Sequence, residues 1–170
     1  YIGNILIFKI LLITIIFIFM CITINIMNYS SQTIKVVYLI GLSSIVIDAL
    51  SIIPNSVFQA FEKLEYITAG ALLRGLLLVI GGFIVIYNQM DVITFGWVYI
   101  FSSFIVLIYS FSIMILKFTK PKLEVDFKFW KWMVREGIQF WAASALGIIF
   151  YNIDKVMLST IVGDQAVGFY

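Results

Sequence analysis

The chain has 170 residues, of which 63% are hydrophobic and 12% are charged, and its formal net charge is +2. Soluble domains are about 45–50% apolar and about 25% charged, so this composition excludes a water-soluble domain, and so small a net charge does not point to a nucleic-acid partner. The chain has no histidine and one cysteine and lacks Walker, HExxH and GxSxG motifs, so we expect no metal site, no cofactor, no catalytic residue and no internal disulfide.

Five apolar stretches are each long enough to cross a bilayer, which takes about 20 residues in a helix. They are continuously apolar rather than alternating, which favours helices over the strands of a barrel. The expected fold class is therefore an all-α, polytopic integral membrane protein, and its abrupt ends lead us to expect a piece of a longer chain. The five predicted spans are residues 5–27, 36–61, 66–87, 92–116 and 133–162.

The second span carries polar residues at intervals of three or four positions, which places them on one face of a helix. Asp48 lies near the middle of this span, and Pro54 removes a backbone hydrogen bond and predicts a kink. We expect the face to meet other protein or a wet cavity rather than lipid. It consists of Gly41, Ser44, Asp48, Ser51, Asn55 and Gln59.

The third span contains Arg74, about eight residues from its start. A charged side chain facing lipid costs about 2.5–3.5 kcal/mol on the insertion scale, so neither Arg74 nor Asp48 is expected to do so. Two interpretations stay open. The two residues form an ion pair that serves packing only, or they line a water-filled cavity in which one or both meet substrate or protons.

A basic segment separates the fourth and fifth spans and holds, together with Arg135, six of the 11 basic residues. The positive-inside rule predicts that the loop 117–132 is cytoplasmic, and it places Lys9 and Lys63 on the same side. The mixture of aromatic rings and lysines suits the headgroup layer, as an interfacial anchor or short surface helix, with a dedicated lipid-headgroup site as the alternative. The candidate anchors are Phe127, Lys128, Trp130, Lys131 and Trp132.

The fifth span is interrupted by Asn152, Asp154 and Lys155. The long lysine side chain can reach outward more easily than the aspartate can. For Asp154 two roles stay open, a place in a cavity and a local pair with Lys155.

Two segments resemble polysaccharide exporters of the Wzx type, which are flippases of the multidrug/oligosaccharidyl-lipid/polysaccharide exporter superfamily. Residues 54–66 are similar to the family's charged turn after a helix that ends in small and aromatic residues. Residues 151–159, with Gly163 and the final Val-Gly-Phe-Tyr, are similar to the first helix of its C-terminal half. The resemblance implies a two-lobed bundle of twelve or more helices, in which 1–116 belongs to the N-terminal lobe, 117–132 is the linker and 133–170 begins the second lobe.

The resemblance further implies a transporter rather than an enzyme. It would move a polyprenyl-pyrophosphate-linked oligosaccharide across the cytoplasmic membrane by alternating access, with membrane lipid around it and H⁺ or Na⁺ as a coupling ion. Asp154 matches the family's Ile-Asp element, and Arg74 is a candidate cavity cation. The alternatives are a drug/cation antiporter of the same superfamily and an integral-membrane glycosyltransferase or polymerase, which would need a large extramembrane loop.

Overall fold

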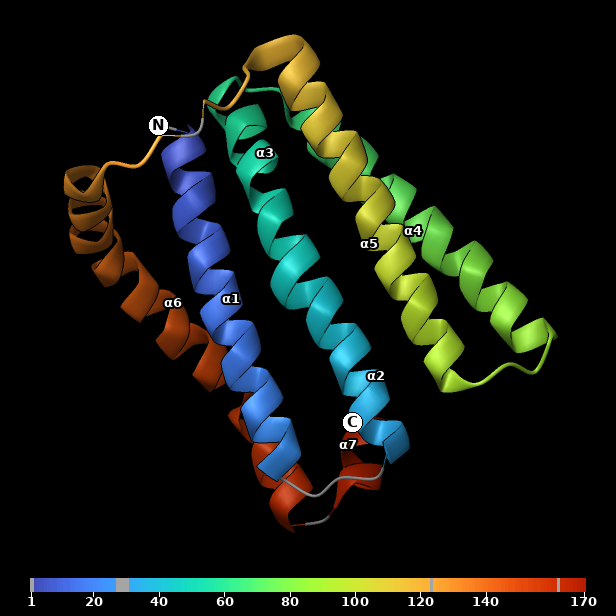
Figure 1. Cartoon of the computed structure of the whole chain (residues 1–170). Coiled ribbons are helices and arrows are strands. Elements are labelled where there is room, and N and C mark those ends of the chain that lie inside the picture. Colours follow the sequence, from blue (N-terminus) through green and yellow to red (C-terminus); the bar gives the residue numbers. More distant parts are fainter. Residues whose placement is uncertain (1, 27–30, 123, 162) are drawn as a thin grey trace. The chain divides into compact units, whose positions relative to one another are not determined.

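The computed structural model describes residues 2–26, 31–122, 124–161 and 163–170 (Figure 1). It is all-helical over these residues, and it divides into two compact units, Tyr1–Val125 and Asp126–Tyr170, which are described separately. The first unit contains α1 (Ile2–Ile26), α2 (Ser31–Gly41), the π-helix η1 (Leu42–Asp48), α3 (Ala49–Ala60), α4 (Leu64–Tyr87), α5 (Val92–Ile113) and the π-helix η2 (Met114–Phe118). The second contains α6 (Phe127–Ile161) and α7 (Asp164–Phe169).

Four helical segments in the described part of the chain are long and apolar enough to cross a membrane: Ile2–Ile24, Ile34–Ala60, Leu64–Tyr87 and Val92–Phe118. They confirm the first four predicted spans, although the end of the first, at residue 27, lies outside the described residues. The fifth predicted span coincides with most of α6, a 35-residue helix whose polar residues keep it out of this set. Its membrane crossing stays a prediction, and its predicted end at residue 162 is not described.

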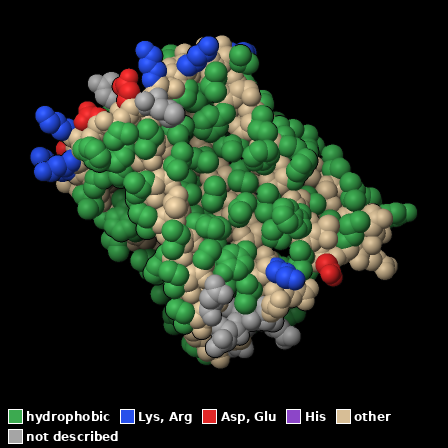
Figure 2. All heavy atoms as spheres, viewed as in Figure 1, with side chains coloured by type: hydrophobic (Ala, Val, Ile, Leu, Met, Phe, Trp, Pro, Cys, Tyr) green, Lys and Arg blue, Asp and Glu red, His purple; other side chains and the backbone are tan. Residues whose placement is uncertain are grey.

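The surface of the molecule matches a lipid environment. Figure 2 shows hydrophobic side chains over the middle of the face formed by α3, α5 and α4, with Lys and Arg side chains near the ends of the helices. Large side chains such as Phe19, Val79 and Phe83 are about 70% exposed. An apolar residue that faces lipid loses nothing by this exposure, so the helices are held together by close packing rather than by hiding apolar surface.

The fourth span occupies the centre of the first unit. Its helix α5 packs along α4 on one side and along α2, η1 and α3 on the other, while α1 packs against α3 and η1 (Figure 1). The second and third spans, although consecutive in sequence, touch each other less than each touches α5. The buried positions of α5 are small, namely Gly96, Ser102, Ser103 and Ser110, which lets the neighbouring helices approach closely.

One end of the unit is closed by a cluster of buried side chains. Val57, Phe58 and Met114 form its centre, with residues from the start of α1, the start of α4 and the end of η2 packed around them. The Lys117 ammonium donates a hydrogen bond of 3.1 Å to the Tyr66 hydroxyl and lies 5.0 Å from the centre of that ring. The first residues of the predicted basic loop are therefore fixed to the beginning of the third span.

Two short turns in the described part of the unit end a helix with a residue in the left-handed conformation. Glu62 has φ 56° after α3 and Gln89 has φ 50° after α4. The next N–H in each turn bonds back five residues, from Lys63 to the Phe58 carbonyl at 2.8 Å and from Met90 to the Val85 carbonyl at 2.9 Å. This pattern satisfies carbonyl groups that a helix end would otherwise leave unpaired.

Gly81 makes the contact between α4 and α5 possible, and a larger residue there should disrupt it. A Cβ atom added at Gly81 would overlap Cγ1 of Val98, whose branched side chain has little freedom to move aside. We expect Gly81→Leu to lower the free energy of unfolding by about 1–3 kcal/mol through overpacking. The measurement is the melting temperature of the purified protein in detergent. Gly75→Leu on the same helix is the control, because nothing lies within 4 Å of its added Cβ, and equal losses from both variants would contradict the assignment.

Candidate functional site in the membrane

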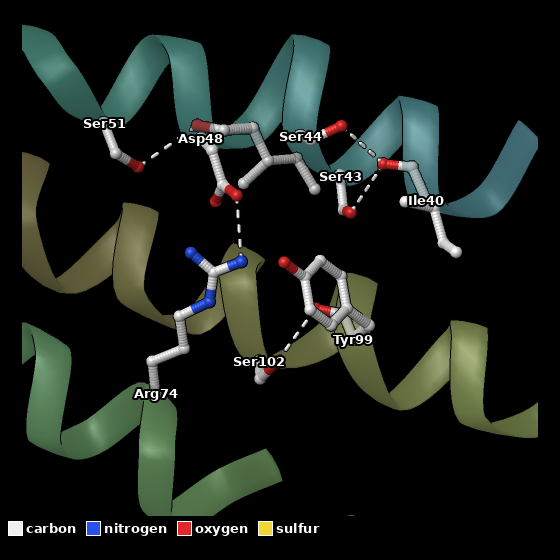
Figure 3. A network of polar contacts seen from close by, with 9 residues as sticks. Ile40, Ser43, Ser44, Asp48, Ser51, Arg74, Tyr99 and Ser102 are labelled. Atoms are coloured by element: carbon white, nitrogen blue, oxygen red, sulfur yellow. Dashed lines mark hydrogen bonds and ion pairs between the residues drawn. The ribbon is translucent and has the colours of Figure 1, made fainter. Parts of the chain in front are cut away.

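The polar centre of the first unit is an ion pair between the second and third spans. Nη2 of Arg74 lies 2.8 Å from Oδ2 of Asp48. The guanidinium carbon also lies 4.9 Å from the centre of the Tyr99 ring of α5, a cation–π distance. Figure 3 shows the Arg74 side chain rising from α4 toward Asp48, with Tyr99 beside it. Three helices thus contribute to one charged group.

Helix geometry explains why the pair can form. Asp48 lies twelve residues before the end of α3 and Arg74 ten residues after the start of α4, which corresponds to about 18 Å and about 15 Å from the shared turn. The long arginine side chain covers the difference. The side chains of Arg74 and Asp48 retain 27% and 30% of their accessible surface, so the pair is not sealed within the protein.

A cavity of about 210 Å³ lies beside the ion pair, and Asp48 and Arg74 both line it. The polar groups in its lining are Asp48, Ser51, Asn55, Arg74 and Ser110, and its apolar wall includes Val106. The structure thus contains both the ion pair and a cavity beside it, and a role of either residue in meeting substrate or protons stays a prediction.

The π-helix η1 leads directly into the charged pair. It covers Leu42–Asp48, so Asp48 is its last residue. Just before it, the Ile40 carbonyl accepts hydrogen bonds from the hydroxyls of Ser43 at 2.9 Å and Ser44 at 2.8 Å (Figure 3). Such serine bonds to the preceding turn supply extra donors where the regular backbone pattern changes. π-helices are rare and are frequently found at functional sites.

The predicted polar face of the second span is present from Asp48 to Asn55 and is interrupted before it. Among the described residues that line the cavity, Ser44 is absent, and Gly41 instead packs against Met20 of α1. The reason is η1: a π-helix has more residues per turn than an α-helix, so positions chosen at 3.6 residues per turn lose their alignment across it. Helix α3 continues through Pro54, and the kink expected there stays a prediction.

Tyr99 and Ser110 are parts of the site that the sequence reasoning missed. Tyr99, Ser102, Ser103, Val106 and Ser110 follow one another at helical spacing on the fourth span. Helical spacing of polar residues marks this second polar stripe, as it marks the one on the second span. It was hidden because none of these residues is charged and serines in apolar helices commonly bond their own backbone, as Ser102 does with the Tyr99 carbonyl.

Comparison with known families gives a match over the whole chain. The model of the family described as polysaccharide biosynthesis protein covers residues 1–170. The chain belongs to this family. No curated protein and no solved structure matches it. Together with the four apolar helices found among the described residues, the match identifies a multi-pass membrane protein of polysaccharide biosynthesis and confirms the family resemblance seen in the sequence.

In the second unit, Asp154 has local partners. Its Oδ2 accepts a hydrogen bond of 2.6 Å from the Tyr170 hydroxyl, and its Oδ1 accepts one of 2.9 Å from the Lys155 backbone N–H. The Lys155 ammonium donates to Oδ1 of Asn152 at 3.1 Å, so within the described residues it forms no ion pair with Asp154. The bond to Asp154 raises the pKa of Tyr170, because a phenolate there would face a carboxylate.

The candidate anchors form the first turns of α6. Oδ1 of Asp126 accepts hydrogen bonds from the N–H groups of Lys128 at 2.9 Å and Phe129 at 3.2 Å, which caps the helix. Rings three residues apart then contact each other, Phe127 with Trp130 at 5.2 Å and Phe129 with Trp132 at 5.8 Å between centres. Lys128 and Lys131 are exposed. The segment is thus helical, and its place in the headgroup layer stays a prediction.

Proposed function

We propose that this protein is a flippase that moves a polyprenyl-pyrophosphate-linked oligosaccharide from the inner to the outer leaflet of the cytoplasmic membrane by alternating access. The observation that carries the proposal is the Asp48–Arg74 pair, which lies in a polar cavity at mid-span in a member of a polysaccharide biosynthesis family. A charged pair that lines a cavity in the middle of a span is typical of a transport pathway.

The cavity is suited to a charged group rather than to a whole oligosaccharide. Its volume of about 210 Å³ is below the roughly 300–1,000 Å³ of pockets that enclose drug-sized ligands. Arginine binds phosphate through two parallel hydrogen bonds, which makes Arg74 the natural partner of the pyrophosphate. Ser51 and Asn55 would hydrogen-bond the adjoining sugar, while the polyprenyl chain stays in the lipid.

Arg74 would exchange its partner Asp48 for the pyrophosphate, and this exchange can be coupled to the movement of an ion. A pyrophosphate that binds Arg74 displaces Asp48, whose carboxylate is then left in the membrane without a cation. Uptake of H⁺ or Na⁺ by Asp48 would neutralise it, and release of the ion would restore the pair and expel the substrate. Asp154 is the second candidate for such a role, on the second unit.

The orientation and the lobes are part of the same proposal. Residues 1–116 would belong to the first lobe and 133–170 to the second, with 117–132 as a cytoplasmic linker. The ends of α1, α3, α4 and η2 that meet in the buried cluster would then face the cytoplasm, which agrees with the position of Lys117 there. The basic side chains at this end of the unit are those that the positive-inside rule places on the cytoplasmic side.

Asn55 offers a test that leaves the charged pair intact. We expect Asn55→Leu to lower export about ten-fold, since one lost hydrogen bond to the sugar is worth about 1–1.5 kcal/mol. Export is measured as surface polysaccharide and as lipid-linked oligosaccharide retained in the inner leaflet of cells that depend on the variant. Gln59→Leu is the matched control, one turn further along α3 and exposed.

If the substrate passes through this cavity, Asn55→Leu lowers export and Gln59→Leu does not. Normal export by Asn55→Leu, at normal protein levels, would contradict a substrate path through this cavity. Failure of the intact wild-type protein to move a fluorescent lipid-linked oligosaccharide across proteoliposome membranes would contradict flippase activity itself.

A further inference from the structure

A second hollow lies between α1 and α3, separate from the polar cavity. It measures about 400 Å³ and extends from Ile2 and Phe61 at the helix ends to Ile52 and Ile53, about two to three turns deeper. Most of its lining is apolar. The exceptions are Lys9 of α1 and Ser56 of α3, whose hydroxyl donates to the Ile52 carbonyl at 2.9 Å. We call this hollow the Lys9 groove.

Lys9 is the charged residue in the lining of this mostly apolar groove. It lies seven residues after the start of α1, within a span, and its side chain is partly exposed. No acidic residue lines the groove among the described residues, and Lys9 has no ion pair within them. A lysine in an apolar span is costly unless an anion or water meets it.

The direction of the side chain indicates where such an anion would lie. Side chains of a helix lean toward its N-terminus, so Lys9 leans toward the end marked by Ile2. That end is the one that the basic residues assign to the headgroup layer, and a long lysine reaches the layer along an apolar wall. The groove therefore presents a cation near its mouth and a hydrocarbon-like wall below it.

We infer that the Lys9 groove binds an anionic phospholipid of the surrounding bilayer, with its phosphate on the Lys9 ammonium and one acyl chain along Ile52 and Ile53. The charge of Lys9 selects the headgroup, and the apolar depth of the groove selects a lipid over a free phosphate ion. The site is independent of the proposed oligosaccharide path, because the described linings of the two cavities share no residue.

Native mass spectrometry of the intact protein, titrated with phosphatidylglycerol or phosphatidylcholine, tests the site. We expect Lys9→Gln to weaken phosphatidylglycerol binding about five-fold, the effect of one lysine on an anionic lipid, and to leave phosphatidylcholine binding unchanged. Lys35→Gln, at an exposed lysine of α2, is the matched control and should have no effect.

A second pair of variants tests the acyl part of the groove. Ser56→Phe fills it and should reduce binding of both lipids, whereas Thr68→Phe should not, since Thr68 makes the same kind of hydroxyl bond on an exposed face of α4, to the Leu64 carbonyl at 3.2 Å. Unchanged lipid preference in Lys9→Gln would overturn the inference. So would displacement of phosphatidylglycerol by equimolar inorganic phosphate, or wild-type protein that retains neither lipid because another part of the protein fills the groove.

Discussion

Replacing Arg74 by glutamine should abolish export and also destabilise the protein. The substitution leaves the Asp48 carboxylate at mid-span without the guanidinium that now lies 2.8 Å away. Breaking a buried ion pair costs about 3–5 kcal/mol, and we expect the lower end because both side chains reach the cavity. Asp48→Asn should destabilise the protein in the same way by leaving Arg74 unpaired.

The double variant Asp48→Asn/Arg74→Gln separates packing from transport. Two neutral amides can hydrogen-bond each other at this site, so the double variant should recover most of the melting temperature that each single variant loses. Export should stay absent, because the cation proposed to bind pyrophosphate is gone. Recovery of both stability and surface polysaccharide would show that the pair serves packing only.

Truncation of Phe58 should have the largest effect on stability alone. Its side chain is fully buried, at 0% exposure, and its ring lies 5.4 Å from that of Tyr66 and 5.5 Å from that of Phe118. We expect Phe58→Ala to lower the free energy of unfolding by about 3–5 kcal/mol, because a large cavity would open where three spans meet. The melting temperature in detergent reports this loss.

Two control variants test separately whether the buried position and the volume of the Phe58 side chain cause the loss of stability. Phe19→Ala removes a ring of α1 that is 70% exposed and should change the melting temperature little. Phe58→Leu keeps most of the volume and should recover a large part of the stability. If the buried and the lipid-facing truncations had equal effects, the cluster would not be the packing centre of the unit.

Much of the fold could be predicted because each span carries its own signal. Twenty continuously apolar residues specify a membrane helix without reference to the rest of the chain, so the first four spans agree with the structure to within a few residues at most described ends. The order in which the helices pack could not be predicted in this way. That α5 lies between the second and third spans depends on the shape of Gly81, Gly96 and Ser102 against their neighbours, which hydropathy does not measure.

The candidate site was predictable where the helix is regular. Asp48, Ser51 and Asn55 share a face because they lie at and beyond the end of the π-helix, and Arg74 was found because any charge within a span demands a partner. Ser44 was placed on the same face by assuming 3.6 residues per turn through residues 42–48, where the structure has a wider turn. Nothing in the residue types of this segment signals a π-helix.

The Asp48–Arg74 contact also has a consequence for biogenesis. Both partners lie on consecutive spans joined by a turn of a few residues, so a nascent chain that has emerged as far as the end of α4 already contains the whole pair. Each charge alone would oppose insertion by about 2.5–3.5 kcal/mol. Neutralised within one helical hairpin, they can enter the bilayer together before α5 is synthesised, and Tyr99 joins a pair that is already made.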